Sequence, residues 1–394
     1  MKQLLTYTAL VTATFCSMSS ALAEVTISGT VDQAFEKVTN SNNSGRSSVS
    51  RLEPTLSNYG ELKFKGSEDL GSGMKANFEL SVKNVGPSDS EDTIDNYTSF
   101  VGLSGNFGNI KMGSQWRPFF TAIAGIDPAQ LAKVPGFVGS SSLGGLSGMG
   151  TSPNQNSITY NLPSLTPGLF IQLQKGLGET SNGHGDSKGM YAIFTDGNKF
   201  FAAYATHEQK MIAFNPTNAA TTAATVGNGV FGAALTGSFG LNPVEALGTY
   251  LTSTNGLNHM LYAASGGETR KLSGTALTYK LGGVKLIYGN AKEKVVGTTA
   301  EISLDAYGFS VPIGESTTFG YLTSQANHKR AANLVAAGLS SQFRLQGERM
   351  LLSYSLSKRT SAYFASGRQK LAGGTSAGNP FSTAVSAVGL QHKF

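Results

Sequence analysis

Apolar and polar side chains alternate along most of the chain after residue 24. The clearest case is residues 74–83, where every second residue is apolar: Met74, Ala76, Phe78, Leu80 and Val82. The same alternation precedes it at residues 61–65, and the short glycine-containing segment 68–73 separates the two. A period of two predicts β-strands rather than helices, and a short glycine-bearing connection predicts a tight hairpin turn.

The same pattern predicts further strands in the rest of the chain. They are expected at residues 24–38, 97–104, 109–117, 156–162, 169–175, 190–196, 199–207, 272–280, 284–292, 302–311, 316–325, 350–356, 360–368 and 384–394, with weaker signals at 230–239 and 244–252. Counting every hairpin gives eighteen strands, and sixteen if residues 230–252 belong to a long loop. No sequence period of about 20–50 residues recurs, so the pattern indicates a meander of hairpins and not a solenoid.

The predicted connections alternate between tight turns and long polar loops. One of the longest is residues 118–154, which contain a possible helical turn and a glycine/serine-rich run. A sheet with one apolar and one charged face could be half of a soluble sandwich or the wall of a membrane barrel. A sandwich gives no reason for loops to be sorted by length, whereas a membrane barrel has short turns on its periplasmic side and long loops outside. The fold class predicted is therefore all-β, a transmembrane antiparallel β-barrel.

The composition agrees with a barrel wall. Charged residues make up 14% of the chain, against roughly 25% in soluble domains. Hydrophobic residues make up 40%, glycine occurs 49 times, and no later segment approaches the ~20 apolar residues of a membrane-spanning helix. This balance fits a sheet in which only every second residue faces lipid.

Residues 1–23 have the pattern of a signal peptide. Lys2 precedes an apolar stretch over residues 4–16, and the small residues Ala21 and Ala23 mark a cleavage site before Glu24. Cleavage would also remove Cys16, the single cysteine, so the exported chain would need neither disulfides nor thiol chemistry. Residues 24–394 are then expected to form one barrel domain.

Five short motifs carry a resemblance to a known family. They are residues 64–71 (FKGSEDLG), 100–105 (FVGLSG), 156–160 (NSITY), 356–361 (LSKRTS) and 388–394 (VGLQHKF). In this order, and behind a signal peptide, they resemble the general porin family of Gram-negative outer membranes over most of the mature chain. The resemblance implies a 16-stranded barrel, with 18 strands as the alternative count, and an outer-membrane location. It also implies a homotrimer that lets small hydrophilic solutes diffuse passively.

The resemblance also assigns roles to two parts of the chain. By its position, the loop at residues 118–154 is the third outer loop, which in this family folds into the lumen and narrows it. The terminal Phe394 belongs to the family's signal to the outer-membrane assembly machinery. Outer-membrane lipid and lipopolysaccharide are the implied surroundings.

The sequence departs from the family where arginines are usual. Glu61, Tyr97 and Ser114 stand at three such positions, and residues 152–155 contain none of the arginine that often precedes Asn156. The usual basic ladder is therefore largely missing, and we expect weak charge selectivity.

Candidate channel residues follow from the alternation, since a pore selects by the field at its narrowest point. The charged face opposite the apolar one, together with the only charges of residues 118–154, gives Glu61, Lys63, Lys65, Lys75, Glu79, Lys111, Arg117, Asp127 and Lys133 as lumen or constriction residues. We expect Lys63, Lys111 and Arg117 to face Asp127. The alternative is that several of these side chains are merely solvated at a rim.

Other functions have little support in the sequence. The five histidines are scattered without metal-site spacing, and no Ser/His cluster, phosphate loop or basic stripe is present. We therefore expect no catalytic residues, no metal, no cofactor and no nucleic-acid partner. Two alternatives remain open: a solute-specific channel with a binding site in the lumen, and a non-conducting barrel that acts as an adhesin through its outer loops.

Overall fold

The structure, a computed structural model, is described for most of the chain after residue 23. The described residues are 24–42, 45–56, 60–85, 94–130, 132, 134, 153–178, 185–210, 269–329, 342–372 and 382–394. The predicted signal peptide, the weak strands at 230–239 and 244–252, and the second half of the 118–154 loop lie outside them. Among these residues no helix is long and apolar enough to cross a membrane.

The described residues form seventeen strands and one short helix. The strands are β1 (Glu24–Asn42), β2 (Gly45–Glu53), β3 (Glu61–Gly71), β4 (Met74–Lys83), β5 (Asp95–Gly105), β6 (Gly108–Trp116), β7 (Pro153–Asn161), β8 (Leu169–Gly176), β9 (Ser187–Thr195), β10 (Phe200–Lys210), β11 (Thr269–Leu281), β12 (Val284–Val295), β13 (Glu301–Ile313), β14 (Thr317–Lys329), β15 (Gln342–Ser355), β16 (Thr360–Ala372) and β17 (Ser382–Lys393). The helix, α2, spans Pro118–Ala124.

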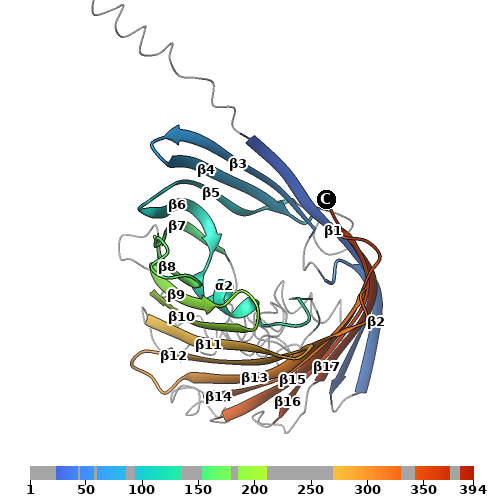
Figure 1. Ribbon diagram of the computed structural model, residues 1–394. Coiled ribbons are helices and arrows are strands. Elements are labelled where there is room, and N and C mark those ends of the chain that lie inside the picture. Colours follow the sequence, from blue (N-terminus) through green and yellow to red (C-terminus); the bar gives the residue numbers. More distant parts are fainter. Residues whose placement is uncertain are drawn as a thin grey trace, which may run out of the picture.

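The strands form one closed antiparallel barrel of sixteen positions (Figure 1). Closure comes from β1, which pairs with β17 from Thr30↔Lys393 to Ser41↔Ser382. On its other edge β1 pairs first with β3 and then with β2, so these two strands share one position. The prediction of sixteen strands is therefore confirmed. The strand predicted at residues 24–38 is longer than expected, because β1 continues to Asn42 and pairs with β2, a strand that was not predicted, from Ala34↔Glu53 to Asn42↔Gly45.

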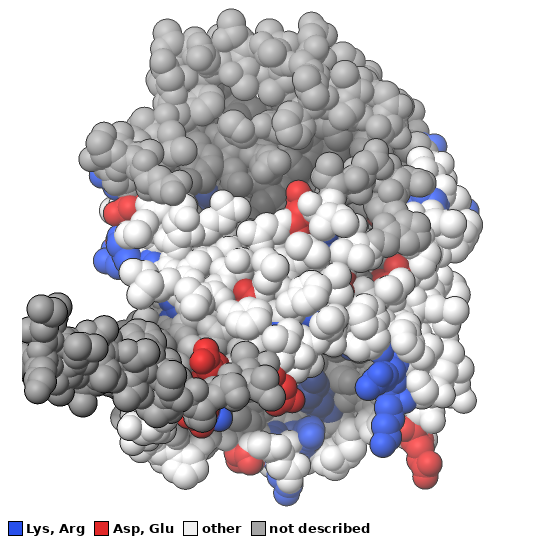
Figure 2. Space-filling view, turned by 90° about the horizontal axis from the view of Figure 1, so that it is seen from above, with Lys and Arg blue, Asp and Glu red and all other residues white. Residues whose placement is uncertain are grey.

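The outer face of the wall is apolar. Side chains such as Val101, Met112 and Tyr307 are 55% to 62% exposed, and each points away from the inner residues beside it in the strand. Figure 2 shows the side of the barrel that lies at the top of Figure 1, where a band with few charged atoms crosses the surface and charges gather along the lower edge. This is the surface expected of a wall in contact with hydrocarbon.

The two ends of the barrel differ in their connections. At one end the strands are joined by short turns, of which residues 72–73, 106–107 and 282–283 have only two residues. At the other end most connections are longer, and the longest runs from residue 211 to residue 268. Since periplasmic turns are short in outer-membrane barrels, the long-loop end faces the cell exterior.

Half of the inner face is apolar as well, contrary to the expectation of a charged inner face. Small and aliphatic residues of β10 to β15 are buried there, including Ala203, Ala276, Ile287, Leu304 and Leu322. They are covered by α2 and the short segment after it, through Phe119, Ala122, Ile123 and Ile126. In Figure 1, α2 accordingly lies inside the ring of strands.

The local sequence explains why a helix begins at Pro118. Proline lacks the N–H that a first helical turn leaves unpaired, so it is favoured at this position. The preceding residue, Arg117, is extended with φ −67° and ψ 142°, and the helix ends at Gly125. The buried residues Pro118, Phe119, Ala122 and Ile123 share one face, which packs on the wall.

Glycines in the wall allow this close packing. A Cβ at Gly274 would lie 2.8 Å from the Phe119 ring, and one at Gly289 would lie 2.4 Å from Ile126. At Gly320 it would lie 2.7 Å from Pro128. The inner surface of β11, β12 and β14 therefore has a depression at each of these glycines, and the segment after β6 packs into them.

Candidate functional site: the channel interior

The charged side chains of β3 to β6 form the most polar part of the inner wall. Register places Lys65 directly opposite Glu79 and Glu61 opposite Lys83, and directly opposite residues share a face. The apolar residues Phe64 and Leu80 of the same strands form another opposite pair, and Leu80 is exposed on the outer face. The predicted orientation of Glu61, Lys63, Lys65 and Glu79 toward the interior agrees with this register.

These four side chains form one ion-pair network. Lys63 Nζ lies 2.9 Å from Glu61 Oε1 and 4.0 Å from Glu79 Oε1, and Lys65 Nζ lies 3.2 Å from Glu79 Oε2. Thr98 of β5 also donates a 2.7 Å hydrogen bond to Glu79. Glu79 is thus held between two lysines, and the Lys65 side chain, although ion-paired, is 54% exposed.

Lys111 and Lys75 extend the basic surface on either side. Lys111 on β6 lies opposite Gly102 of β5, and its Nζ is 4.4 Å from the centre of the Phe100 ring. This is within the range of a cation–π interaction. Lys75 lies opposite Asp69 and is exposed close to the short turn after β3. Lys111 therefore belongs to the middle of the wall and Lys75 to its periplasmic end.

Asp127 does not face the lysines, so that prediction is wrong. Its carboxylate is buried and lies 2.8 Å from Arg349 Nη1 of β15. Arg349 also donates to the carbonyl oxygens of Ala132 and Val134, and Ala129 N donates to Asp127 Oδ1. A buried carboxylate needs a paired cation. Arg349 provides that cation from β15, the strand against which this part of the loop lies. Arg349 thereby attaches the loop to the wall at three points, Asp127, Ala132 and Val134.

Arg117 and Lys133, the other two predicted residues of the loop, say less about the channel lining. Arg117 is 9% exposed, immediately before α2, and its carbonyl oxygen accepts hydrogen bonds from the N–H and the hydroxyl of Thr121. It therefore lies at the root of the loop. Lys133 lies outside the described residues.

A second charged cluster on β1 and β2 was not predicted. Arg51 Nε lies 2.7 Å from Glu36 Oε2, and Arg51 Nη1 lies 3.8 Å from Glu53 Oε1. Close by, Asp32 accepts hydrogen bonds from Tyr363 Oη at 2.7 Å and from Leu56 N at 2.6 Å. The alternation of residues 30–36 could have identified Asp32 and Glu36 as inward-facing. Val31 and Phe35, which lie next to them in the strand, are apolar and exposed on the outer face.

Arg349 was also missed, because the predicted strand began one residue later. Its alternation with Met350 places it inside with Leu351 and Leu322. No local pattern indicates a partner 222 residues away in the chain.

The comparisons with known proteins agree with this architecture. A family model described as Gram-negative porin matches residues 6–374. The chain is 26% identical over 357 residues to the major outer membrane protein P.IA of Neisseria meningitidis serogroup C, covering 88% of this chain and 85% of that protein. It is 24% identical to the major outer membrane protein P.IB of Neisseria lactamica, covering 95% and 96%.

Solved structures share the fold. An anion-selective porin from Comamonas acidovorans superposes with a TM-score of 0.68 at 20% identity, covering 94% of this chain and all of that one. Salmonella typhi OmpF, in complex with daunomycin, gives a TM-score of 0.57 at 14% identity, with 96% and 99% coverage. The chain therefore belongs to the Gram-negative porin family and forms an outer-membrane channel for passive diffusion.

Proposed function

We propose that solutes and ions cross the barrel between the segment that starts at α2 and the charged inner wall of β3 to β6. The observation that carries this proposal is the division of the inner face. The β10–β15 half is mostly apolar and covered by α2, and its buried charges are paired with one another, Arg270 with Glu293 and Arg349 with Asp127. The β3–β6 half keeps Glu61, Lys63, Lys65 and Lys111. Water and ions follow the half whose charges they can solvate.

The charged residues have distinct proposed roles along this path. Lys63, Lys65, Glu79 and Lys111 line its narrow part, and Glu61 and Lys75 lie toward its wider sections. Arg117 and Lys133 act at the loop itself, whereas Asp127 contributes as a structural anchor because Arg349 neutralises it. The loop over residues 118–154 narrows the path from the opposite side.

Weak charge selectivity is the proposed consequence. Lysines and glutamates are interspersed on the wall, with Glu79 within ion-pair distance of two lysines. The Comamonas porin is described as anion-selective, but Glu61, Tyr97 and Ser114 of this chain stand where arginines are usual in the family. A mixed wall produces a smaller net field than a wall with charges of one sign.

Single-channel recording of the refolded protein in planar bilayers tests conduction. We expect open, ohmic channels, and a protein that inserts but never conducts would disprove a diffusion channel and favour the adhesin alternative. Reversal potentials in a salt gradient measure selectivity, and we expect them close to zero. A strong anion preference would show that the residues at the constriction are assigned wrongly.

Two partner proposals accompany the channel. A homotrimer is supported by the related fold of Vibrio cholerae OmpT, described in a trimer form, with a TM-score of 0.57. Phe394 is proposed to be read by the assembly machinery, and in the folded barrel it exchanges two backbone hydrogen bonds with Gly29 at the seam. Native mass spectrometry of the folded protein should give the mass of three chains, and a single-chain mass would contradict the trimer.

A solute-specific channel remains the second candidate. The concentrated ion-pair network of β3 and β4 is the feature that could bind one solute in preference to others. Saturable block of the conductance by a single solute would favour this candidate, and the absence of such block by every small solute tested would exclude it.

A further inference from the structure

Aromatic side chains form a strip along the proposed path inside the barrel. The rings of Tyr97 and Trp116 meet edge to face with their centroids 5.1 Å apart, and Trp116 stacks on Phe120 at 4.2 Å with 20° between the ring planes. Phe100, three residues after Tyr97 on β5, continues this aromatic strip toward the middle of the wall. We infer that the strip, together with Lys111, binds aromatic carboxylates on their way through the channel.

The position of the strip follows from the elements that carry it. Phe120 belongs to α2, which lies inside the ring of strands (Figure 1), and stacking on Phe120 places the Trp116 ring inside as well. Phe100 is directly opposite Glu79 of β4, and directly opposite residues share a face. The strip therefore runs from the charged inner wall to α2, and these are the two borders of the proposed path.

Each ring of the strip keeps part of its surface uncovered. All four side chains are half-buried, whereas Phe119, the neighbour of Phe120 on α2, is only 1% exposed. Gly113 lies directly opposite Phe100 on β6 and has no side chain that could cover the Phe100 ring. Such rings offer a flat apolar surface to solutes, and an aromatic ring stacked on them gains attraction beyond the burial of its area.

Lys111 supplies the charge that selects a carboxylate. Its Nζ lies 4.4 Å from the centre of the Phe100 ring, at the end of the strip farther from α2. Lys65 of the same wall is already paired with Glu79 at 3.2 Å, whereas no carboxylate among the described residues lies within ion-pair distance of Lys111. Lys111 is half-buried, and a partly desolvated cation without a counterion favours an anionic group beside it.

The rings and the lysine together define the class of solute. Successive residues of a strand are about 3.3 Å apart, so roughly 10 Å separate Tyr97 and Phe100 along β5. A single aromatic ring with a carboxylate bridges this interval together with the Lys111 side chain. An aliphatic acid meets only the requirement for charge and a neutral ring only that for stacking, and Lys111 repels an aromatic cation.

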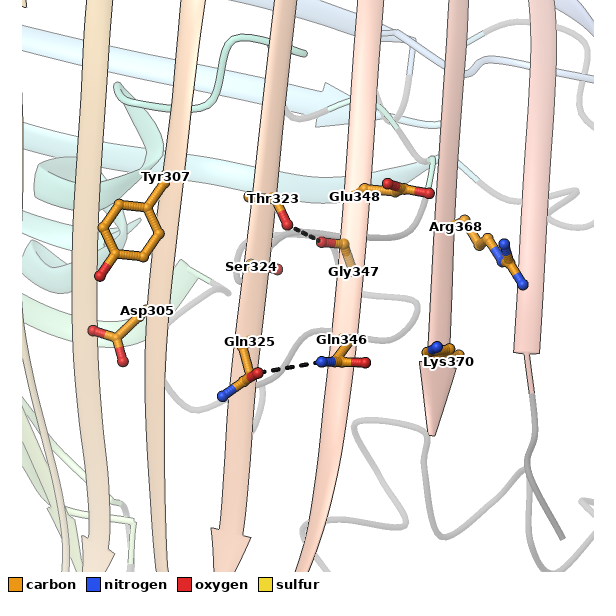
Figure 3. Close-up of a pocket in the computed structure, with 10 residues that line it drawn as sticks. All are labelled: Asp305, Tyr307, Thr323, Ser324, Gln325, Gln346, Gly347, Glu348, Arg368 and Lys370. Carbon is orange, nitrogen blue, oxygen red and sulfur yellow. Dashed lines mark hydrogen bonds between the residues drawn. The ribbon is translucent and has the colours of Figure 1, made fainter. Parts of the chain in front are cut away.

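A depression on the outer face of β13 to β16 offers a matched comparison. Figure 3 shows Tyr307 in it, together with Asp305, Glu348, Arg368 and Lys370. These side chains alternate with buried residues of the same strands, so they face away from the channel. Two carboxylates offset the two cations there. Tyr307 and Lys370 therefore provide control positions, an aromatic ring and a lysine outside the path.

The test uses Trp116, which reports binding directly because it is the only tryptophan of the chain. The refolded protein in detergent is titrated with benzoate at constant ionic strength, and tryptophan fluorescence is excited at wavelengths that benzoate does not absorb. We expect a saturable change. Cyclohexanecarboxylate has the charge without the flat ring and should bind roughly threefold to tenfold more weakly. Benzyl alcohol has the ring without the charge and should bind about tenfold more weakly.

Two variants test the residues of the site. Tyr97→Leu removes a ring and should weaken benzoate binding roughly threefold to tenfold. Lys111→Gln removes the cation and should weaken it about tenfold. The controls Tyr307→Leu and Lys370→Gln should bind benzoate as the unmodified protein does. Lys111→Gln replaces no ring of the strip, so it supplies the test if Tyr97→Leu does not fold.

Three results would overturn the inference. They are the absence of a saturable fluorescence change with benzoate, equal binding of cyclohexanecarboxylate, and equal binding of benzoate by Lys111→Gln and the unmodified protein. The inference rests on the proposed path, but fluorescence measures binding without conduction. Channel recordings on the same preparations therefore separate the two proposals. A barrel that binds benzoate and never conducts contradicts only the channel, and an open channel that binds no benzoate contradicts only the inference.

Discussion

At the scale of single residues, the buried pair of Asp127 and Arg349 is the most consequential contact inside the barrel. It joins the loop to a strand more than two hundred residues away, and both side chains are fully buried. A buried ion pair affects stability mainly when one partner is removed. The other charge then remains buried without a counterion, which destabilises the folded protein.

Replacing Arg349 by glutamine should therefore release the loop. Loss of one partner of a buried pair costs about 3–5 kcal/mol, and the carbonyl oxygens of Ala132 and Val134 lose their donor as well. We expect an increased single-channel conductance with larger current fluctuations. Arg344→Gln on the same strand, where the side chain is exposed, is the control and should conduct normally. Unchanged conductance in Arg349→Gln would contradict the anchoring role.

Asp196, in the turn between β9 and β10, makes the stability of the folded protein depend on pH. Its Oδ1 accepts hydrogen bonds from the N–H groups of Asn198, Lys199 and Phe200 at 2.8–2.9 Å. These hydrogen bonds, that from Phe200 first, lower the pKa of Asp196 below its ordinary value of 3.8. The stability they contribute is present above that ordinary value and is lost as the pH falls through the lowered folded value.

The stabilities of the unmodified protein and Asp196→Ala should therefore differ by a constant amount at neutral pH and converge in acid. Urea unfolding at a series of pH values measures this difference. A difference that persists at a pH well below 3.8 would show that the carboxylate charge is not its source.

At the scale of elements, the packing of α2 depends on wall positions that have no side chain. Gly320→Ala introduces a Cβ 2.7 Å from Pro128 Cβ and 2.9 Å from its carbonyl oxygen. Neither atom is the end of a flexible side chain, so the loop must move. Gly283→Ala in a short turn is the control, since its Cβ meets only Pro312 at 3.8 Å.

We expect Gly320→Ala to change conductance and Gly283→Ala to leave it unaltered. Truncation of a buried phenylalanine costs roughly 3–5 kcal/mol, so Phe119→Ala should loosen the same segment from the other side. Equal conductance in all three variants would show that α2 does not border the path.

The sequence predicted the elements well where one face is polar. In β3 and β4 the alternation of Lys65 with Phe64 and of Glu79 with Phe78 determined both strand and orientation. In β10 to β15 both faces are apolar, as with Ala203 and Tyr204 on β10, and the period of two no longer tells inside from outside. The partner of Asp127 could not be predicted, because pairing across the barrel depends on closure and leaves no mark on nearby residues.

At the scale of the whole molecule, the sorting of connections predicted the membrane barrel and its orientation. The division of the interior into an apolar and a charged half could not be predicted in the same way. It arises because α2 folds back on strands that follow it in the chain, and it confines the proposed path to the side of β3 to β6. Charge reversal at Lys65 and Lys111 should then shift the reversal potential toward cation preference, while reversal at Lys199, in the short turn between β9 and β10 at the periplasmic end, should not.

The pairing of β1 with β17 has a consequence for biogenesis. The two termini must meet before the cylinder is complete, so every earlier stage has two open margins whose N–H and C=O groups find no water within hydrocarbon. A chain that stops before Ser382 lacks the strand that joins Thr30 through Ser41. The barrel can therefore close only after β17 has been made, so closure waits for the end of synthesis.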